Sequence, residues 1–85
     1  MASYEVLIKR SAAKELEALP TKDRRRIATK IRTLANDPRP PGVEKLSGEE
    51  KYRIRQGDYR LLYAIDDAAR QVTVVKIGHR RDVYR

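Results

Sequence analysis

The stretch Lys51-Tyr-Arg-Ile-Arg-Gln-Gly-Asp-Tyr-Arg-Leu-Leu-Tyr-Ala-Ile65 predicts a β-hairpin together with its register. Apolar and polar residues alternate on both sides of Gly57-Asp58, and a two-residue loop that begins with Gly is a recognised hairpin turn. This loop pairs Arg55 with Arg60, Ile54 with Leu61, Arg53 with Leu62 and Tyr52 with Tyr63. Because successive side chains of a strand point to opposite faces, one face is predicted to be apolar: Tyr52, Ile54, Leu61, Tyr63 and Ile65.

The other face of the hairpin concentrates positive charge. Arg53, Arg55 and Arg60 share it, and we call them the arginine face. Like charges directly opposite each other, roughly 5 Å apart at Cβ, destabilise a sheet. An anion bound between the guanidinium groups would offset this repulsion, and phosphate fits their fork geometry best. The sequence therefore predicts a phosphate-binding surface. The alternative is a solvated face, or ion pairs with carboxylates of the helices.

The remaining residues predict two helices and two further strands. Residues 4–9 are rich in β-branched and aromatic residues, as in a strand. Ser11 can cap a helix through about Leu19, and Thr21 can cap a second helix that ends at residues 36–38. Residues 71–77 predict a central strand covered on both faces and ended by Gly78. The order βααβββ indicates an α+β fold, with an N-terminal strand and αα-hairpin packed on a mainly antiparallel sheet and a short C-terminal tail.

Composition restricts the classes of function. The chain has 85 residues and a net charge of +8, which indicates one small domain with a polyanionic or acidic partner. The second helix carries a basic face of Lys22, Arg25, Arg26 and Arg32. With no Cys and one His, thiolate and multi-histidine metal sites are excluded, and we expect neither metal nor cofactor. No apolar run approaches the ~18 residues of a membrane span and no signal peptide is evident, so a cytoplasmic protein without membrane contact is expected.

The end of the chain adds further polar groups to the arginine face. The strand through Ile77 leads to His79, Arg80, Arg81 and Tyr84. If it pairs beside the strand with Arg60, all these groups converge, hold consecutive phosphates and stack a base on Tyr84. RNA cleavage without metal also requires a base for the 2′-OH proton, cations for the phosphorane and an acid for the leaving oxygen. Arginine supplies the cations, but its pKa above ~12 makes it a poor base.

Four segments together resemble a known family. They are Lys45-Leu-Ser-Gly48, Tyr-Arg-Ile-Arg (52–55), Tyr-Arg-Leu-Leu-Tyr (59–63) and Val-Val-Lys-Ile-Gly-His-Arg-Arg-Asp-Val-Tyr (74–84). In this order and spacing the chain resembles the RelE branch of the RelE/ParE toxin superfamily, as a single RelE-like domain over residues 1–85. The resemblance implies a toxin of a type II toxin–antitoxin system, an mRNA interferase that inhibits translation by cleaving mRNA in the ribosomal A site through 2′-OH attack, independently of metal.

The resemblance also implies partners and roles. The partners are the 70S ribosome with its mRNA, a RelB-like antitoxin that is acidic and partly disordered when free, and operator DNA reached through that antitoxin. Arg60 and Arg80 match the phosphate-contacting and transition-state arginines, and Tyr84 matches the tyrosine that stacks on the mRNA base. Arg53 and Arg55 stand where the RelE pattern has lysines, one of them a proposed general base, and Ser47 stands where it has a further basic residue. We expect Arg55 in the catalytic set, and Arg53 and Arg81 as RNA-binding residues.

Proton transfer has a second scheme within the same resemblance. A sister branch, similar to YoeB, uses a glutamate just before the Leu of the connector as base and a C-terminal histidine as acid. Glu44 lies at the equivalent glutamate position, and His79 is near the right end of the chain without being terminal. The structural alternatives are that Glu44 pairs with Lys45 or Arg39, that His79 caps a strand, and that Tyr84 packs on the sheet edge.

Two other functions stay open. The ParE branch poisons DNA gyrase, is not a nuclease, and would not need the combined set of arginines and Tyr84. A non-catalytic basic module that binds RNA, or only its antitoxin, would result if the competent base were missing.

Overall fold

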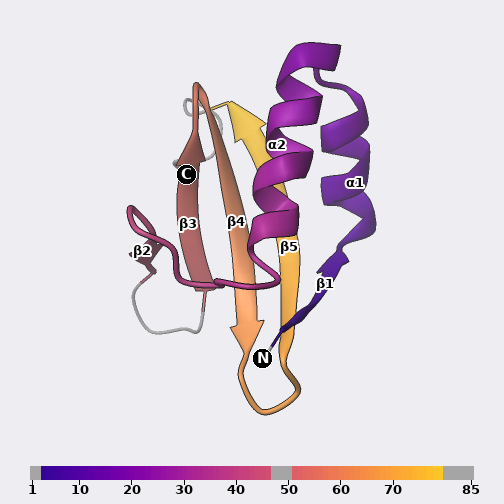
Figure 1. Ribbon diagram of the computed structural model, residues 1–85. Helices are drawn as coiled ribbons and strands as arrows, with labels where there is room; N and C mark the ends of the chain where they lie inside the picture. The colour runs from indigo at the N-terminus through magenta and orange to yellow at the C-terminus, as the bar shows by residue number, and fades with distance from the viewer. Residues whose placement is uncertain (1–2, 47–50, 80–85) are drawn as a thin grey trace.

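The computed structural model describes residues 3–46 and 51–79 and has two helices packed on one face of a sheet (Figure 1). Within these residues the elements are β1 (Glu5–Ile8), α1 (Arg10–Glu17), α2 (Thr21–Thr33), β2 (Glu44–Lys45), β3 (Lys51–Gln56), β4 (Tyr59–Asp66) and β5 (Gln71–His79). The strand order is β1-β5-β4-β3-β2, and among these described strands only the β1–β5 pair is parallel. The predicted α+β fold is confirmed, with the short strand β2 as an addition.

The predicted hairpin register is confirmed. In the β3–β4 pair, Arg55 faces Arg60 and Tyr52 faces Tyr63. Gly57 has a φ of +63°, whereas Asp58 is not among the residues with positive φ. A positive φ at the first central residue alone is what a type II′ turn requires, and Gly adopts it without steric cost. The turn therefore determines which side chains of both strands point to which face.

The core lies between the sheet and the two helices. The sheet contributes the face that the sequence predicted to be apolar, together with three residues of β5; the helical segment contributes four residues. The buried residues are Tyr52, Ile54, Leu61, Tyr63, Ile65, Val72, Val74 and Ile77 from the sheet, and Ala12, Ile27, Ile31 and Leu34 from the helical side. No charged side chain among residues 3–46 and 51–79 is buried. The charges therefore lie on the surface, where solvent or a partner can reach them.

Strand β5 differs from its prediction in two ways. It continues through Gly78 to His79, because Gly78 still pairs with Arg60 of β4. It is also buried on one face only, since Thr73 and Val75 on the other face are half-exposed. The four residues of β1 cover only the first part of its outer edge. Farther along, the Glu15 carboxylate of α1 accepts hydrogen bonds from the Ile77 N–H (2.9 Å) and the Lys76 Nζ (3.0 Å). The backbone N–H of Ile77 at this edge thereby has a hydrogen-bond partner.

Both helices start earlier than predicted. Helix α1 begins at Arg10 with Lys9 as its N-cap residue, and α2 begins at Thr21 after Pro20. Neither N-cap makes a side-chain hydrogen bond, so the predicted caps are wrong. The physical reason at α1 is the preceding strand: the Lys9 N–H still bonds to the Val74 carbonyl (2.9 Å), and the chain turns directly from this pairing into the helix. None of the helices in the described part of the chain is long and apolar enough to span a membrane.

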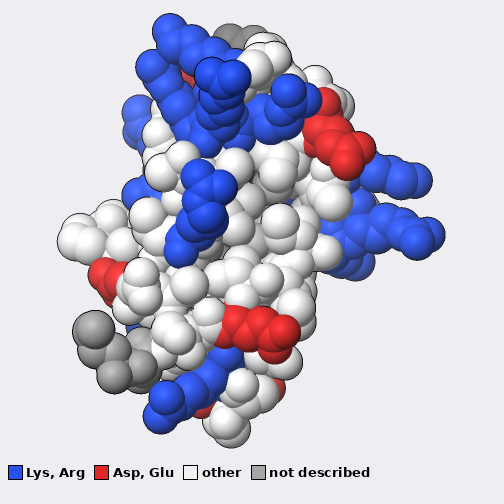
Figure 2. All heavy atoms as spheres, turned by 45° about the vertical axis from the view of Figure 1, so that its right-hand side comes forward, with Lys and Arg blue, Asp and Glu red and all other residues white. Residues whose placement is uncertain are grey.

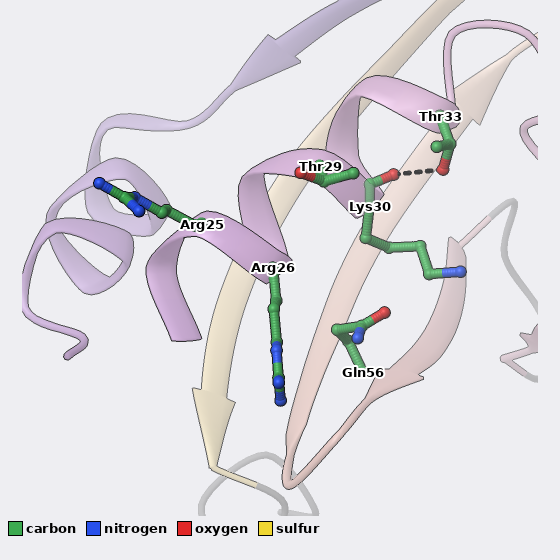
Figure 3. Close-up of a pocket in the computed structure, with 6 residues that line it drawn as sticks. All are labelled: Arg25, Arg26, Thr29, Lys30, Thr33 and Gln56. Atoms are coloured by element: carbon green, nitrogen blue, oxygen red, sulfur yellow. Dashed lines mark hydrogen bonds between the residues drawn. The ribbon is translucent and has the colours of Figure 1, made fainter. Parts of the chain in front are cut away.

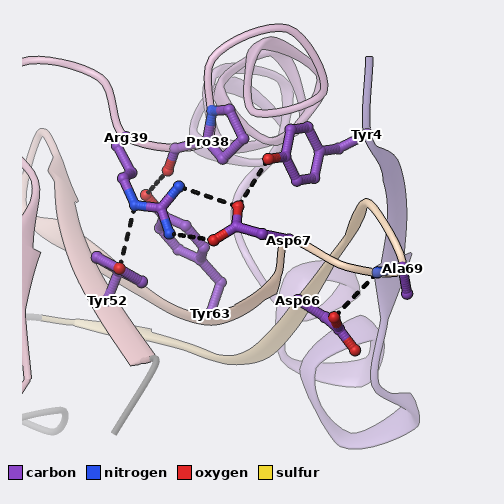
Figure 4. Close-up of polar contacts among 8 residues, drawn as sticks. All are labelled: Tyr4, Pro38, Arg39, Tyr52, Tyr63, Asp66, Asp67 and Ala69. Carbon is purple, nitrogen blue, oxygen red and sulfur yellow. Dashed lines mark hydrogen bonds and ion pairs between the residues drawn. The ribbon is translucent and has the colours of Figure 1, made fainter. Parts of the chain in front are cut away.

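A polar cluster fixes the connector between α2 and β2 (Figure 4). The Tyr63 hydroxyl donates to the Pro38 carbonyl (2.6 Å), and its ring stacks on Tyr52 at 5.9 Å between centroids. Arg39 donates to both carboxylate oxygens of Asp67 (3.2 and 2.9 Å) and to the Tyr52 hydroxyl (3.1 Å). The Tyr4 hydroxyl also donates to Asp67 (2.7 Å). The connector is thereby held on the sheet just before it forms β2.

We expect Tyr63→Phe to lower the free energy of unfolding by about 1–3 kcal/mol, because the buried Pro38 carbonyl loses its hydrogen-bond donor. The matched control is Tyr4→Phe, whose hydroxyl bond is exposed and whose acceptor Asp67 keeps Arg39; it should cost less than ~0.5 kcal/mol. Urea unfolding of the three proteins checks this. Equal stability of Tyr63→Phe and Tyr4→Phe would contradict the importance of the buried bond.

Asp67 should make the free energy of unfolding depend on pH in the acidic range. Hydrogen bonds from Arg39 and then from Tyr4 lower the pKa of Asp67 in the folded state. Its stabilising contribution is therefore complete above the unfolded pKa of ~3.9, and is lost as the pH falls through the lower folded pKa. Thermal melts should show wild type more stable than Asp67→Asn at neutral pH, with the difference vanishing in acid. Asp58→Asn, in the exposed hairpin turn, is the control for loss of a carboxylate. A difference for Asp67→Asn that is independent of pH would be the contrary result.

Candidate functional site

The arginine face lies on the side of the sheet away from the helices. Because Tyr52, Ile54 and Leu61 point into the core, alternation turns the three arginines to the opposite side. Arg55 is exposed, and Arg53 and Arg60 are half-buried. The sheet thus presents three guanidinium groups on one face, with the two opposed arginines at the end of the hairpin nearest its turn.

Gly78 extends this arrangement onto β5. Arg55 of β3, Arg60 of β4 and Gly78 of β5 form one row across the three strands. Gly78 itself contributes no side chain to this row beside Arg60. The sequence pattern indicates for Gly78 only the end of a strand. Gly78 matters to the site because its register partner on β4 is Arg60. No local sequence pattern reveals that pairing.

Glu44 joins the same face through β2. Its register partner is Arg53, and Arg53 donates from Nε (3.2 Å) and Nη2 (3.0 Å) to the Glu44 Oε1. The Arg53 side chain is 19% exposed and that of Glu44 is 61% exposed, so the carboxylate faces solvent. The expected alternative was an ion pair with Lys45 or Arg39; the ion pair is formed with Arg53 instead. A carboxylate is therefore held beside the arginines in an accessible position.

His79 lies on the opposite face of the sheet, so the expected convergence with the arginines is corrected. Its register partner is Tyr59, and the two rings meet edge to face at 5.8 Å. Tyr59 packs against the hydrophobic core on the helix side. Alternation explains the placement, because Gly78 faces the arginine side and the next residue must face away. Burial, and then the Asp23 carboxylate of α2, raise the pKa of Tyr59 on this side.

Three of the residues expected at the site lie outside the described residues: Arg80, Arg81 and Tyr84. Their expected roles therefore stay predictions. Ser47, which stands where the RelE pattern has a basic residue, also lies outside the described residues.

The described part of the site combines cations with one carboxylate. An anion between Arg55 and Arg60 would relieve the repulsion between them, and guanidinium forks bind phosphate oxygens well. The Glu44 carboxylate can accept a proton, which arginine cannot do at neutral pH. Across residues 3–46 and 51–79, no group of three or more His, Asp or Glu side chains is placed to hold a metal ion.

Comparison with known proteins identifies relatives over nearly the whole chain. The family model of the ParE toxin of the type II toxin–antitoxin system parDE matches residues 6–84. The toxin RelE of Mycobacterium tuberculosis is 34% identical over 84 residues, which cover 96% of this chain and 87% of that protein.

Solved structures have the same fold. The toxin–antitoxin complex RelBE2 from Mycobacterium tuberculosis superposes with a TM-score of 0.82 at 28% identity, covering 92% of this chain and 99% of that chain. The isolated RelE toxin of E. coli superposes with a TM-score of 0.79 at 28% identity, covering 91% of this chain and 84% of that chain. The match to the family model and to the curated relative, each spanning most of the sequence, leads to one conclusion: the chain belongs to the RelE/ParE superfamily and is a toxin of a type II toxin–antitoxin system.

Proposed function

We propose that this toxin is an endoribonuclease that cleaves mRNA in the ribosomal A site, without metal, and so inhibits translation. The observation that supports it best is the opposed pair Arg55–Arg60, with the Glu44–Arg53 ion pair on the same face. Two opposed cations are costly in a sheet that has only a structural task. They are useful where a phosphodiester acquires additional negative charge during reaction. The toxin relatives named RelE support the same assignment.

In this proposal the scissile phosphate binds between Arg55 and Arg60. Gly78 is in register with Arg60 and places no side chain of its own beside this phosphate. As the 2′-oxygen attacks phosphorus, the phosphorane becomes dianionic, and the two guanidinium groups stabilise it more than they stabilise the monoanionic substrate. Arg80 would add a further cation, Arg81 a phosphate contact, and Tyr84 a stacking surface for the base.

Glu44 is the proposed general base. It removes the proton of the 2′-OH, the O2′–P bond forms, and the P–O5′ bond breaks to leave a 2′,3′-cyclic phosphate. Arg53 orients the carboxylate by its two hydrogen bonds to Oε1. The leaving 5′-oxygen takes a proton from a water molecule of this solvent-facing site, since His79 is not positioned for that step: its ring is on the helix side of the sheet.

The proposed partners are a RelB-like antitoxin and the 70S ribosome with its mRNA. An acidic antitoxin segment that is disordered when free would be attracted by the charge of +8 and would inhibit by covering the arginine face. Solved complexes of relatives contain RelB-type antitoxins, as in the RelE–RelB complex from Pyrococcus horikoshii. Contact with operator DNA would be made through the antitoxin, and the proposed location is the cytoplasm.

A second candidate function is inhibition of DNA gyrase, because the matching family model is described as a ParE toxin. This activity would use surface charge without phosphodiester chemistry. Two assays separate the candidates: cleavage of mRNA on programmed ribosomes, and DNA supercoiling by purified gyrase. Inhibition of supercoiling without mRNA cleavage would favour the ParE activity and exclude the nuclease.

Arg60→Ala should lower the single-turnover rate of mRNA cleavage on programmed ribosomes by about 10²–10³-fold, because it removes a cation that stabilises the transition state. Arg60→Lys should recover only part of the rate, since a lysine keeps the charge but loses the fork. The matched control is Arg24→Ala, an exposed arginine of α2 on the other side of the sheet. Melting temperatures of all variants verify folding. Full activity of a folded Arg60→Ala protein would rule out the proposed phosphate site.

Glu44→Gln should slow the same cleavage step by about 10²–10⁴-fold, the usual contribution of a general base. Stability should change little, because an exposed ion pair such as Glu44–Arg53 contributes only ~0–1 kcal/mol. Glu17→Gln, an exposed carboxylate at the end of α1, is the control. The dependence of the cleavage rate on pH supplies the second readout, since loss of the base should remove the acidic limb of the profile. An unchanged rate and profile would exclude Glu44 as the base.

A further inference from the structure

A second basic surface lies on the helix side of the sheet. Figure 2 shows Lys and Arg gathered at the end of the molecule where α1 and α2 are joined. Between α2 and the end of β3 is a cavity of about 330 Å³, lined by Arg25, Arg26, Thr29, Lys30, Thr33 and Gln56. This volume falls in the range of ~300–1,000 Å³ that is typical of sites for small molecules. We call it the α2–β3 groove.

Arg26, Lys30 and Gln56 line the groove from two different elements. Figure 3 shows Arg26 and Lys30 extending toward the β3–β4 hairpin, where Gln56 lies, whereas Arg25 points the other way. Arg26 and Lys30 are one helical turn apart, about 5–6 Å along the axis. Like charges at this spacing destabilise a helix by ~0.2–0.5 kcal/mol. In the described part of the chain, no hydrogen bond or ion pair joins either cation to a carboxylate.

The chemistry of the lining indicates which ligand fits. It contains two arginines, a lysine, two threonines and a glutamine, and it contains neither a carboxylate nor a large apolar side chain. Thr29 accepts a weak bond from Arg32 and keeps its hydroxyl proton for another acceptor, whereas the Thr33 hydroxyl is used on the Lys30 carbonyl. These residue types are those that contact phosphate and sugar in nucleic-acid complexes. Much of the accessible lining is apolar, as the stems of long basic side chains and threonine methyl groups are, but no large apolar side chain forms a pocket of the kind that would hold the anchors of an amphipathic helix.

The position of the groove connects it to the arginine face. Arg55 and Gln56 are consecutive residues of β3 whose side chains point to opposite faces of the sheet. Both lie at the hairpin turn, where the sheet ends. A single RNA strand that leaves the arginine face at Arg55 can therefore pass around the hairpin and reach Gln56, Arg26 and Lys30. We propose that the α2–β3 groove binds the phosphodiester backbone of single-stranded RNA next to the segment on the arginine face. The inference rests on the proposed function in taking RNA as the ligand.

The test uses RNA that cannot be cleaved, so that binding is separated from catalysis. The probe is a single-stranded oligonucleotide with 2′-O-methyl riboses, and its affinity is measured by fluorescence anisotropy over a series of salt concentrations. Arg26→Gln/Lys30→Gln should weaken binding and reduce the slope of log K against log salt by ~1.4, or ~0.7 for each lost phosphate contact.

The matched control is Lys14→Gln/Arg24→Gln. It removes the same charge from two exposed helical residues outside the groove, and Arg24 lies about 200° around α2 from Arg26. The control should keep most of the wild-type affinity and slope. Equal losses in both double variants would mean that only net charge matters and would overturn the proposal. Wild-type affinity in the groove variant would overturn it as well.

A measurement on the unmutated protein keeps the test independent of folding defects. The chain has two glutamines. Gln56 lies in the groove, whereas the side-chain amide of Gln71 donates a hydrogen bond to Glu5 on the edge strand β1. In NMR titration with the same oligonucleotide, the side-chain amide resonances of Gln56 should shift and those of Gln71 should not. A shift of Gln56 with poly-glutamate peptide but not with RNA would overturn the proposal and assign the groove to an acidic protein. The Arg60→Ala variant separates this proposal from the proposed function. It should lose mRNA cleavage, whereas binding of the oligonucleotide in the α2–β3 groove should be unchanged.

Discussion

The β3–β4 register is the constraint on which the rest of the structure depends. The turn at Gly57-Asp58 makes Arg55 face Arg60, and alternation then determines the role of every residue in both strands. A shift of one residue would put arginines into the core and expose Tyr52, Ile54 and Leu61 to solvent. The large apolar area buried between the sheet and the helices therefore opposes any other register. In this way the hydrophobic effect maintains the opposed arginines despite their repulsion.

The same alternation gives the sheet two faces with separate tasks. The helix side contains the buried tyrosines, isoleucines, leucine and valines, and the other side contains the guanidinium groups. Gly78 and His79 show how strict this division is. Gly78 is in register with Arg60 on the arginine side, whereas the adjacent His79 meets the ring of Tyr59 on the helix side. Loss of a folding contact and loss of an activity can therefore be separated by choosing the face on which a substitution is made.

Glu44 depends on contacts that are remote from it in sequence. Strand β2 has only two residues and could not form alone. Its connector is held by the bond from Tyr63 to Pro38 and by the bonds from Arg39 to Asp67 and Tyr52. These contacts join the connector to β3, β4 and the β4–β5 turn. The carboxylate that we propose as base is thus positioned by the core and by a polar cluster on the far side of the connector, and its ion pair with Arg53 sets its final orientation.

The sequence by itself determined the α+β fold, the order of the main elements, the hairpin register and the arginine face, because each follows from turn chemistry and from a period of two or 3.6 residues. It also indicated Glu44 through family resemblance. Tertiary structure alone decided that Glu44 pairs with Arg53, that Gly78 lies beside Arg60, that His79 turns away, and that Arg26 and Lys30 face Gln56 across a groove. Such contacts join residues on different elements, so they depend on strand order, on the β5 register with its irregularity near Leu62 and Tyr63, and on the packing of α2. No local pattern encodes those relations, because each results from burying the apolar faces of all the elements together.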